Sequence, residues 1–163
     1  LAKVFAVLNR VAEKFGEPVI VSTHPRTRKR ADVAQLTPHP LVQFHKPFGF
    51  LDYIRLQSDA RAVISDSGTI TEESSILNFP AVNLRDVHER PEGSEEGSVM
   101  FTGLDPERVT DALAIVADQT RGDQRMLRMV NDYLPTNVSE KVLRIITSYT
   151  GFVKRKTWGQ DLG

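Results

Sequence analysis

Apolar residues recur at three- and four-residue steps over positions 1–15, and Gly16 and Pro18 follow this stretch. The spacing predicts an amphipathic helix that ends at the glycine. Residues 19–21 are wholly apolar, which is typical of a strand covered on both faces. The two patterns then alternate along the rest of the chain, so helices and strands are expected in turn.

Further strands are expected at 41–44, 62–64, 81–84 and 98–102, and a polar loop is expected at about 85–97. Residues 24–30 are expected to begin as a loop and to turn into a short basic helix. Helices are expected at 50–56 and 70–77, then from Pro106, and last from about Asn137, where Glu140 completes a capping box. The last helix carries an apolar stripe formed by Val142, Ile145, Ile146, Tyr149, Phe152 and Val153. Alternation of this kind predicts an α/β domain with a parallel, doubly wound sheet and helices on both faces.

Composition excludes several classes of protein. The length of 163 residues suits one domain. The 21 basic residues balance 21 acidic ones, which argues against a nucleic-acid or anionic-membrane partner. Cysteine is absent, which excludes disulfides and thiol nucleophiles and fits a cytoplasmic protein. Neither a membrane-spanning run nor metal-ligand spacing of the four histidines is present, so neither a metal nor a cofactor is expected.

Residues 65–69, Ser-Asp-Ser-Gly-Thr, connect a predicted strand to a predicted helix. Backbone N–H groups at such a helix start, together with the helix dipole, favour a phosphate group, and Gly68 lets the backbone approach it. Thr69 and Glu72 alternatively match a capping box that needs no ligand. Spacing alone leaves both interpretations open.

For other candidate ligand contacts, the sequence evidence is weaker than for the turn at 65–69. Arg90, in a dense charged loop, could clamp a pyrophosphate or take part in internal ion pairs. His24 is either a ligand contact or a loop imidazole, and Tyr53 and Phe48 either meet a base ring or lie in the core. The basic side chains expected on an exposed helix face are Arg26, Arg28, Lys29 and Arg30.

The motifs taken together are more specific than any one of them. The run from Ser65 to Ser74, then Pro80 to Val82, then Glu89-Arg90-Pro91-Glu92, resembles the signature of the non-hydrolysing UDP-N-acetylglucosamine 2-epimerases. Residues 24–27, His-Pro-Arg-Thr, resemble another motif of that family. Order and separation agree as well, so the resemblance covers essentially the whole chain.

One subgroup is more similar still. Thr69 stands where many members have a second glycine, and residues 46–53, 74–80 and 137–150 resemble enzymes that make UDP-N-acetyl-L-fucosamine. Those enzymes epimerise C2 of a UDP-2-acetamido-2,6-dideoxy-L-hexose in capsule or O-antigen precursor synthesis. Phe48 stands where family members have a glutamine.

The resemblance implies that residues 1–163 form the C-terminal, Rossmann-like UDP-binding domain of a glycosyltransferase-B-like protein. Ser67, Gly68 and Thr69 would donate hydrogen bonds to the UDP phosphates, and Arg90 would lie near them. Glu73 would accept from the ribose hydroxyls, and Tyr53 would border the uracil. Further contacts implied for the UDP-sugar come from His24 and Glu72.

The implied reaction is elimination of UDP across C1–C2 followed by re-addition with C2 inverted. Its acid and base belong to an N-terminal domain, so no catalytic residue is expected here, and the first residue, Leu1, suggests a piece of a longer, homodimeric parent. The apolar stripe of the last helix would then lose part of its cover. Two alternatives stay open: a UDP-sugar glycosyltransferase with the same fold, and a nucleotide-binding module without chemistry.

Overall fold

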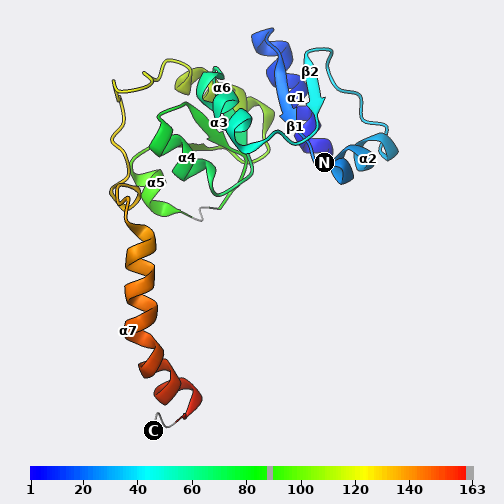
Figure 1. Cartoon of the computed structure of the whole chain (residues 1–163). Coiled ribbons are helices and arrows are strands. Elements are labelled where there is room, and N and C mark those ends of the chain that lie inside the picture. Colours follow the sequence, from blue (N-terminus) through cyan, green and yellow to red (C-terminus); the bar gives the residue numbers. More distant parts are fainter. Residues whose placement is uncertain (88–89, 161–163) are drawn as a thin grey trace. The chain divides into compact units, whose positions relative to one another are not determined.

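The computed structural model describes residues 1–87 and 90–160, without the side chain of Asp32, as two units, 1–133 and 134–163. The elements of the first unit (Figure 1) are α1 Ala2–Phe15, β1 Val19–Ser22, α2 Pro25–Val33, β2 Val42–His45, α3 Phe50–Asp59, β3 Val63–Ser65, α4 Ile70–Leu77, β4 Ala81–Asn83, α5 Pro91–Glu95, β5 Met100–Phe101, α6 Pro106–Val116 and the 3₁₀ turn η1 Asn131–Tyr133. The second unit contains α7 Val138–Trp158. The expected alternation of helices and strands is therefore confirmed.

All paired strands run parallel, as predicted, but they form two sheets. β1 pairs with β2 in one sheet, and β3, β4 and β5 form the other in that order. The prediction of one continuous sheet is therefore wrong for the described residues. Apolar runs indicate which segments are strands, whereas the partner at each strand edge is decided by packing.

The three-stranded sheet carries helices on both faces. Ile64, Val82 and Met100 point toward α1 and α6, where Val82 is fully buried. Their chain neighbours Val63, Ala81 and Phe101 point the opposite way, toward Ile70 of α4 and the buried Phe79. Alternate residues of a strand face opposite sides, so two-sided cover explains why these short runs are wholly apolar.

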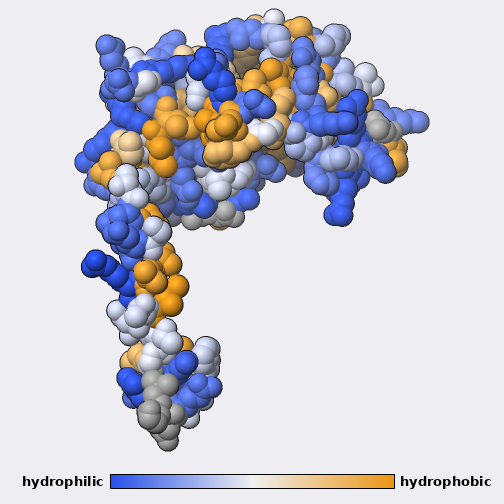
Figure 2. All heavy atoms as spheres, viewed as in Figure 1, coloured by the Kyte–Doolittle hydropathy of each residue, from blue (hydrophilic) through white to orange (hydrophobic). Residues whose placement is uncertain are grey.

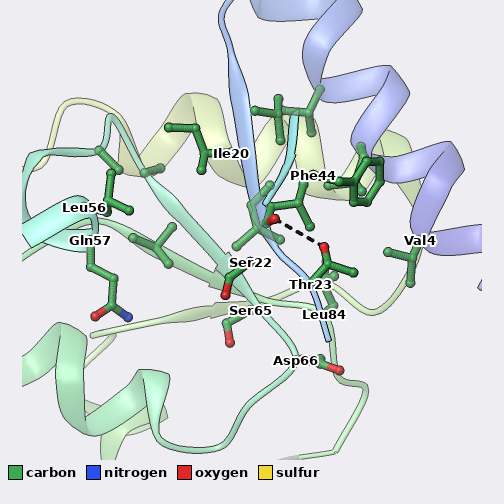
Figure 3. A pocket seen from close by; sticks show the side chains of 18 of the residues that line it. Val4, Ile20, Ser22, Thr23, Phe44, Leu56, Gln57, Ser65, Asp66 and Leu84 are labelled. Carbon is green, nitrogen blue, oxygen red and sulfur yellow. Dashed lines mark hydrogen bonds between the residues drawn. The ribbon is translucent and has the colours of Figure 1, made fainter. Parts of the chain in front are cut away.

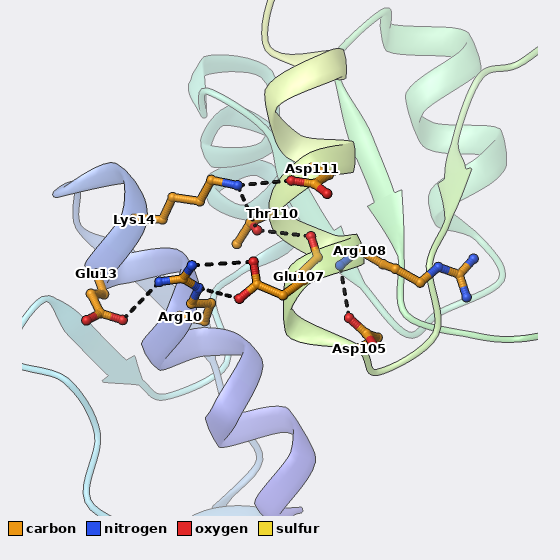
Figure 4. Close-up of polar contacts among 8 residues, drawn as sticks. All are labelled: Arg10, Glu13, Lys14, Asp105, Glu107, Arg108, Thr110 and Asp111. Atoms are coloured by element: carbon orange, nitrogen blue, oxygen red, sulfur yellow. Dashed lines mark hydrogen bonds and ion pairs between the residues drawn. The ribbon is translucent and has the colours of Figure 1, made fainter.

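Helix α1 packs against both sheets. Val7 and Val11 join the core around α6 and β4, while Leu8 and Ala12 pack on Val42 of β2. Polar contacts also join α1 to α6 (Figure 4): Arg10 bonds to Glu107, and Lys14 bonds to Thr110 and Asp111. Within α1, Glu13 accepts a further hydrogen bond from Arg10. The hydrogen bonds that Arg10 donates, first to Glu107, raise the pKa of that guanidinium.

Strand β1 is covered less than the sequence predicted. Ile20 is 49% exposed, and the strand alternates between half-buried and exposed residues. The reason is that β1 pairs only with β2, and a cavity lies between it and β3. The expectation of a strand covered on both faces is thus wrong here.

Three local predictions also differ from the structure. The loop predicted at 85–97 contains the short helix α5, which Pro91 starts. Neither Thr69 nor Asn137 makes a side-chain cap bond, so the two capping boxes do not form. A cap residue needs an extended backbone for its oxygen to reach the first turn, and Thr69 has helical angles instead, with φ −65° and ψ −18°.

Helix α7 has no buried residue along its 21 positions. Apolar side chains gather along one side of it (Figure 2) and are about half exposed: Val142 47%, Ile145 58%, Ile146 59%, Tyr149 59% and Phe152 52%. The expected apolar stripe is therefore present on α7. Within the described residues, no helix combines the length and hydropathy that a bilayer crossing needs.

Candidate functional site

The turn between β3 and α4 is held by its own hydroxyl groups. The Ser67 amide donates to Ser65 Oγ at 3.1 Å, and the Thr69 amide donates to Ser67 Oγ at 3.3 Å. The hydroxyls of Ser67 and Thr69 share a further hydrogen bond of 2.9 Å. Ser67 therefore closes the turn that precedes α4. Ser67 and Gly68 are half-buried and Thr69 is exposed, so the turn remains accessible.

Asn83, at the end of β4, ties this turn to the next loop. Its side chain is 1% exposed, donates to the Ser67 carbonyl at 3.0 Å and accepts from the Arg85 amide at 2.9 Å. The Arg85 guanidinium donates a hydrogen bond from Nε to the Asp66 carbonyl at 2.5 Å. A buried amide with both ends bonded fixes two loops at the carboxyl ends of neighbouring parallel strands, where ligands of such sheets bind.

The two adjacent carboxylates of α4 take different partners. Glu72 forms an ion pair with the Arg90 guanidinium, and both side chains are part-buried. Glu73 accepts a hydrogen bond of 2.6 Å from Gln57 Nε2 of α3. Two negative charges near the first turn of a helix would repel a phosphate, and the pairing with Arg90 offsets one of them.

Tyr53 lies one helical turn before Gln57 on α3. Burial raises the pKa of the Tyr53 hydroxyl, and the charges of Glu73 and then Asp66 raise that pKa further. The tyrosine is therefore close enough to feel both carboxylates and remains neutral at physiological pH. Tyr53, Glu73 and the turn after β3 thus belong to one neighbourhood.

A cavity of about 1100 Å³ opens beside this neighbourhood, between β1 and β3 (Figure 3). Gln57, Ser65 and Asp66 lie around it, and Tyr53 and His24 also line it. Ser67, Gly68, Thr69, Glu73 and Arg90 lie outside its lining. His24 is exposed, and its Nδ1 accepts from the Arg26 amide at 3.3 Å at the start of α2.

Helix α5 is fixed behind the arginine by a second contact. Tyr133 of η1 donates to Glu92 Oε1 at 2.8 Å, and burial, followed by this hydrogen bond, raises the pKa of the Tyr133 hydroxyl. Gly93 lies against Thr71 so closely that an added Cβ would stand 1.9 Å from Thr71 Cγ2. The start of α5, and with it Arg90, is therefore set against α4.

In the structure Ser67 and Thr69 share a hydrogen bond within one turn, Arg90 pairs with Glu72, and Tyr53 lies close enough to Glu73 for that carboxylate to raise the tyrosine pKa. His24 borders the cavity instead. The basic side chains of α2 are exposed, as predicted, and Phe48 is half-buried. Among the described residues no group of three His, Asp or Glu side chains could hold a metal ion.

Three further residues organise the site and were missed: Gln57, Asn83 and Tyr133. Asn83 carried a signal, since a polar residue at the end of a buried strand run is uncommon. Gln57 lies among residues that look like an ordinary helix face. Tyr133 lies in a stretch with no periodicity, so its partner on α5 could not be inferred.

Residues 1–147 match the model of the family described as UDP-N-acetylglucosamine 2-epimerase. The chain belongs to that family. Among curated relatives, the UDP-N-acetylglucosamine 2-epimerase of Methanococcus maripaludis is 33% identical over 117 residues, which cover 69% of this chain and 32% of the relative. The enzyme of the same name from Methanocaldococcus jannaschii is 30% identical over 141 residues, which cover 84% of this chain and 37% of the relative.

Solved structures of this epimerase family match the fold. The UDP-N-acetylglucosamine 2-epimerase of Rickettsia bellii superposes with a TM-score of 0.84 at 38% identity, covering 97% of this chain and 43% of that one. The M. jannaschii enzyme in complex with UDP-GlcNAc and UDP gives a TM-score of 0.77 at 27% identity, covering 90% and 40%. This α/β chain with parallel strands therefore corresponds to part of an epimerase with a glycosyltransferase-B-like fold, about a third to two-fifths of its length.

Proposed function

We propose that residues 1–163 form the C-terminal, UDP-binding domain of a non-hydrolysing UDP-N-acetylhexosamine 2-epimerase. The observation that carries the proposal is the strand–turn–helix of residues 63–77, which carries hydroxyl and amide donors, Glu72 paired with Arg90, and Glu73 held by Gln57. Family membership over residues 1–147 favours an epimerase over a glycosyltransferase. A matched relative was solved with UDP-GlcNAc and UDP, which supports a UDP-sugar ligand.

In this proposal the turn after β3 holds the UDP phosphates. Ser67, Gly68 and Thr69 supply amide and hydroxyl donors at the positive end of the α4 dipole. On binding, phosphate oxygens would take the place of the serine hydroxyl oxygens that now accept from the amides of Ser67 and Thr69. Arg90 supplies positive charge, and Glu72 orients that guanidinium rather than touching the ligand.

The nucleoside part of the ligand lies beside Glu73 and Tyr53. The Glu73 carboxylate accepts hydrogen bonds from the ribose hydroxyls, and Tyr53 borders the uracil ring. The two side chains are close enough for the Glu73 charge to raise the pKa of Tyr53. His24, on the rim of the cavity, is the candidate contact for the part of the ligand farthest from the turn.

The reaction eliminates UDP across C1–C2 and adds it back with C2 inverted. Negative charge develops on the departing UDP, and this chain contributes by stabilising that charge with Arg90 and the turn donors. The acid and base lie in an N-terminal domain outside this chain, so the chain alone is inactive. The parent acts as a homodimer on UDP-2-acetamido-2,6-dideoxy-L-hexose, toward UDP-N-acetyl-L-fucosamine, in capsule or O-antigen precursor synthesis.

A titration with UDP followed by amide NMR tests the binding role. Saturable shifts are expected around residues 67–73 and at Arg90. Glu73→Ala should raise the dissociation constant for UDP about tenfold or more, because a charge-assisted hydrogen bond to ribose is lost. Glu95→Ala is the matched control, an exposed carboxylate on α5 whose removal should leave the affinity unchanged. Unmoved amides in this chain and in a longer chain with the relatives' remaining length would overturn the proposal.

A further inference from the structure

Gln57 is the most deeply buried polar side chain of α3, with 2% of its surface exposed. A glutamine amide offers two N–H donors and one carbonyl acceptor, and burial without partners costs free energy. One donor, on Nε2, goes to Glu73 Oε2 at 2.6 Å, which is short for an N–H···O bond and typical of a charged acceptor. The amide carbonyl Oε1 is buried and has no hydrogen-bond partner in the structure.

The carboxylate of Glu73 fixes the orientation of this amide. An ionised carboxylate only accepts hydrogen bonds, so Nε2 must face it, and a flipped amide would place two acceptors against each other. The unpartnered Oε1 is therefore a consequence of holding Glu73. A core position would favour a leucine or methionine here, since either would fill the space without a buried unsatisfied oxygen.

Glu73 is rooted in the first turn of α4, where its amide donates to the Thr69 carbonyl at 2.9 Å. Its side chain is half-buried and would otherwise sample several rotamers. The contact from α3 holds one carboxylate oxygen and leaves the other for a ligand. Tyr53 on α3 feels the charges of Glu73 and of Asp66, and Glu72 next to Glu73 pairs with Arg90.

We propose that Gln57 is a positioning residue that holds the Glu73 carboxylate for the vicinal diol of a ribonucleotide and so sets the preference for ribose. The proposal rests on the proposed function, because it assigns the ribose of the bound UDP to Glu73. Gln57 reaches Glu73 from the wall of the cavity, where Figure 3 shows its side chain on α3. Held in one orientation, the carboxylate meets the diol with less loss of side-chain freedom on binding.

Gln57→Met separates this role from a purely structural one. Methionine keeps the length and volume of glutamine and removes both the donor and the unpartnered carbonyl oxygen. The variant should be at least as stable as the wild type in a thermal melt. A residue kept only for a structural hydrogen bond would lose stability on the same change.

The readout is the ratio of affinities for UDP and its 2′-deoxy and 3′-deoxy analogues, measured by calorimetry on the 163-residue chain. The wild type should prefer UDP over at least one analogue by about tenfold, and Gln57→Met should bring that ratio close to one. Gln57→Glu keeps size and polarity but sets a second carboxylate against Glu73. This variant should bind UDP no more tightly than Gln57→Met does. Gln119→Leu, a half-buried glutamine bonded to Asn78 at the far end of α4, is the matched control and should keep the ratio.

The outcomes separate the two proposals. Failure of the wild type to bind any of the three nucleotides would count against the proposed function itself. Binding of UDP with no preference for ribose, or a preference that survives in Gln57→Met, would overturn the role of Gln57 and leave the UDP site standing. Loss of the preference with unchanged stability in Gln57→Met alone would establish the positioning role.

Discussion

Helices α1 and α7 carry the same kind of apolar stripe and differ in what surrounds it. In α1 the side chains of the stripe pack against α6 and both sheets, and Val7 has no exposed surface. In α7 no residue is buried, and Ile146 is 59% exposed. The periodicity predicted both helices correctly, so an apolar stripe identifies a helix without identifying its cover.

Stability should therefore be distributed very unevenly between the two units. The first unit holds the buried clusters, and α7 relies on helix propensity and local contacts. The only tryptophan, Trp158, lies in α7, so its fluorescence reports on that helix, whereas loss of the helical circular dichroism of the first unit reports on the core.

The largest change in the free energy of unfolding is expected from placing one charge in the apolar stripe of α1, compared with one in that of α7. Val7→Glu should destabilise the first unit by about 4 kcal/mol or more, because glutamate keeps the helix propensity but buries an unpaired carboxylate. Ile146→Glu should change stability by less than about 0.5 kcal/mol. Urea unfolding followed by circular dichroism measures both. Equal losses would mean that the α7 stripe is covered in solution.

A moderate effect is expected from the polar contacts of α1 with α6. Lys14 Nζ lies 3.0 Å from both Thr110 Oγ1 and Asp111 Oδ1. Lys14→Met should cost about 0.5–1 kcal/mol, and less at about 1 M salt, because a partly exposed ion pair is screened. Lys141→Met, on exposed α7, is the control and should be neutral in the same unfolding assay. An equal cost at high salt would show that packing, rather than charge, is lost.

The smallest effect concerns the irregular segment between α6 and α7, where Arg128 pairs with Glu96 of the first unit. Hydrogen bonding to Arg128 lowers the pKa of Glu96 below its ordinary value of 4.5. The contribution of this pair is thus complete above that value and is lost as the pH falls through the lowered pKa. The melting temperature of the wild type should exceed that of Glu96→Gln slightly at about pH 7, and the difference should shrink steadily as the pH falls below the ordinary glutamate pKa. A difference that persists in acid would contradict this.

The candidate site could be predicted in part. A Ser-Asp-Ser-Gly turn that follows a buried strand marks the carboxyl edge of a parallel sheet, and that placement is confirmed. The Thr69 amide donates to Ser67 Oγ, and Glu72 pairs with Arg90, whereas spacing had left a capping box of Thr69 and Glu72 open. The difference arises because Arg90 comes from a loop 18 residues away, and local spacing carries no information about such a partner.

The sequence by itself determined the class of the fold, the positions of nearly all helices and strands, and the family, because periodicity and motifs act over a few neighbouring residues. The tertiary structure decided which strands share a sheet, that Ile20 stays half exposed, and that Gln57 meets Glu73. These features depend on contacts between residues far apart in the chain. Such contacts form only when whole elements pack, and the free energy of packing is a property of the assembled surfaces.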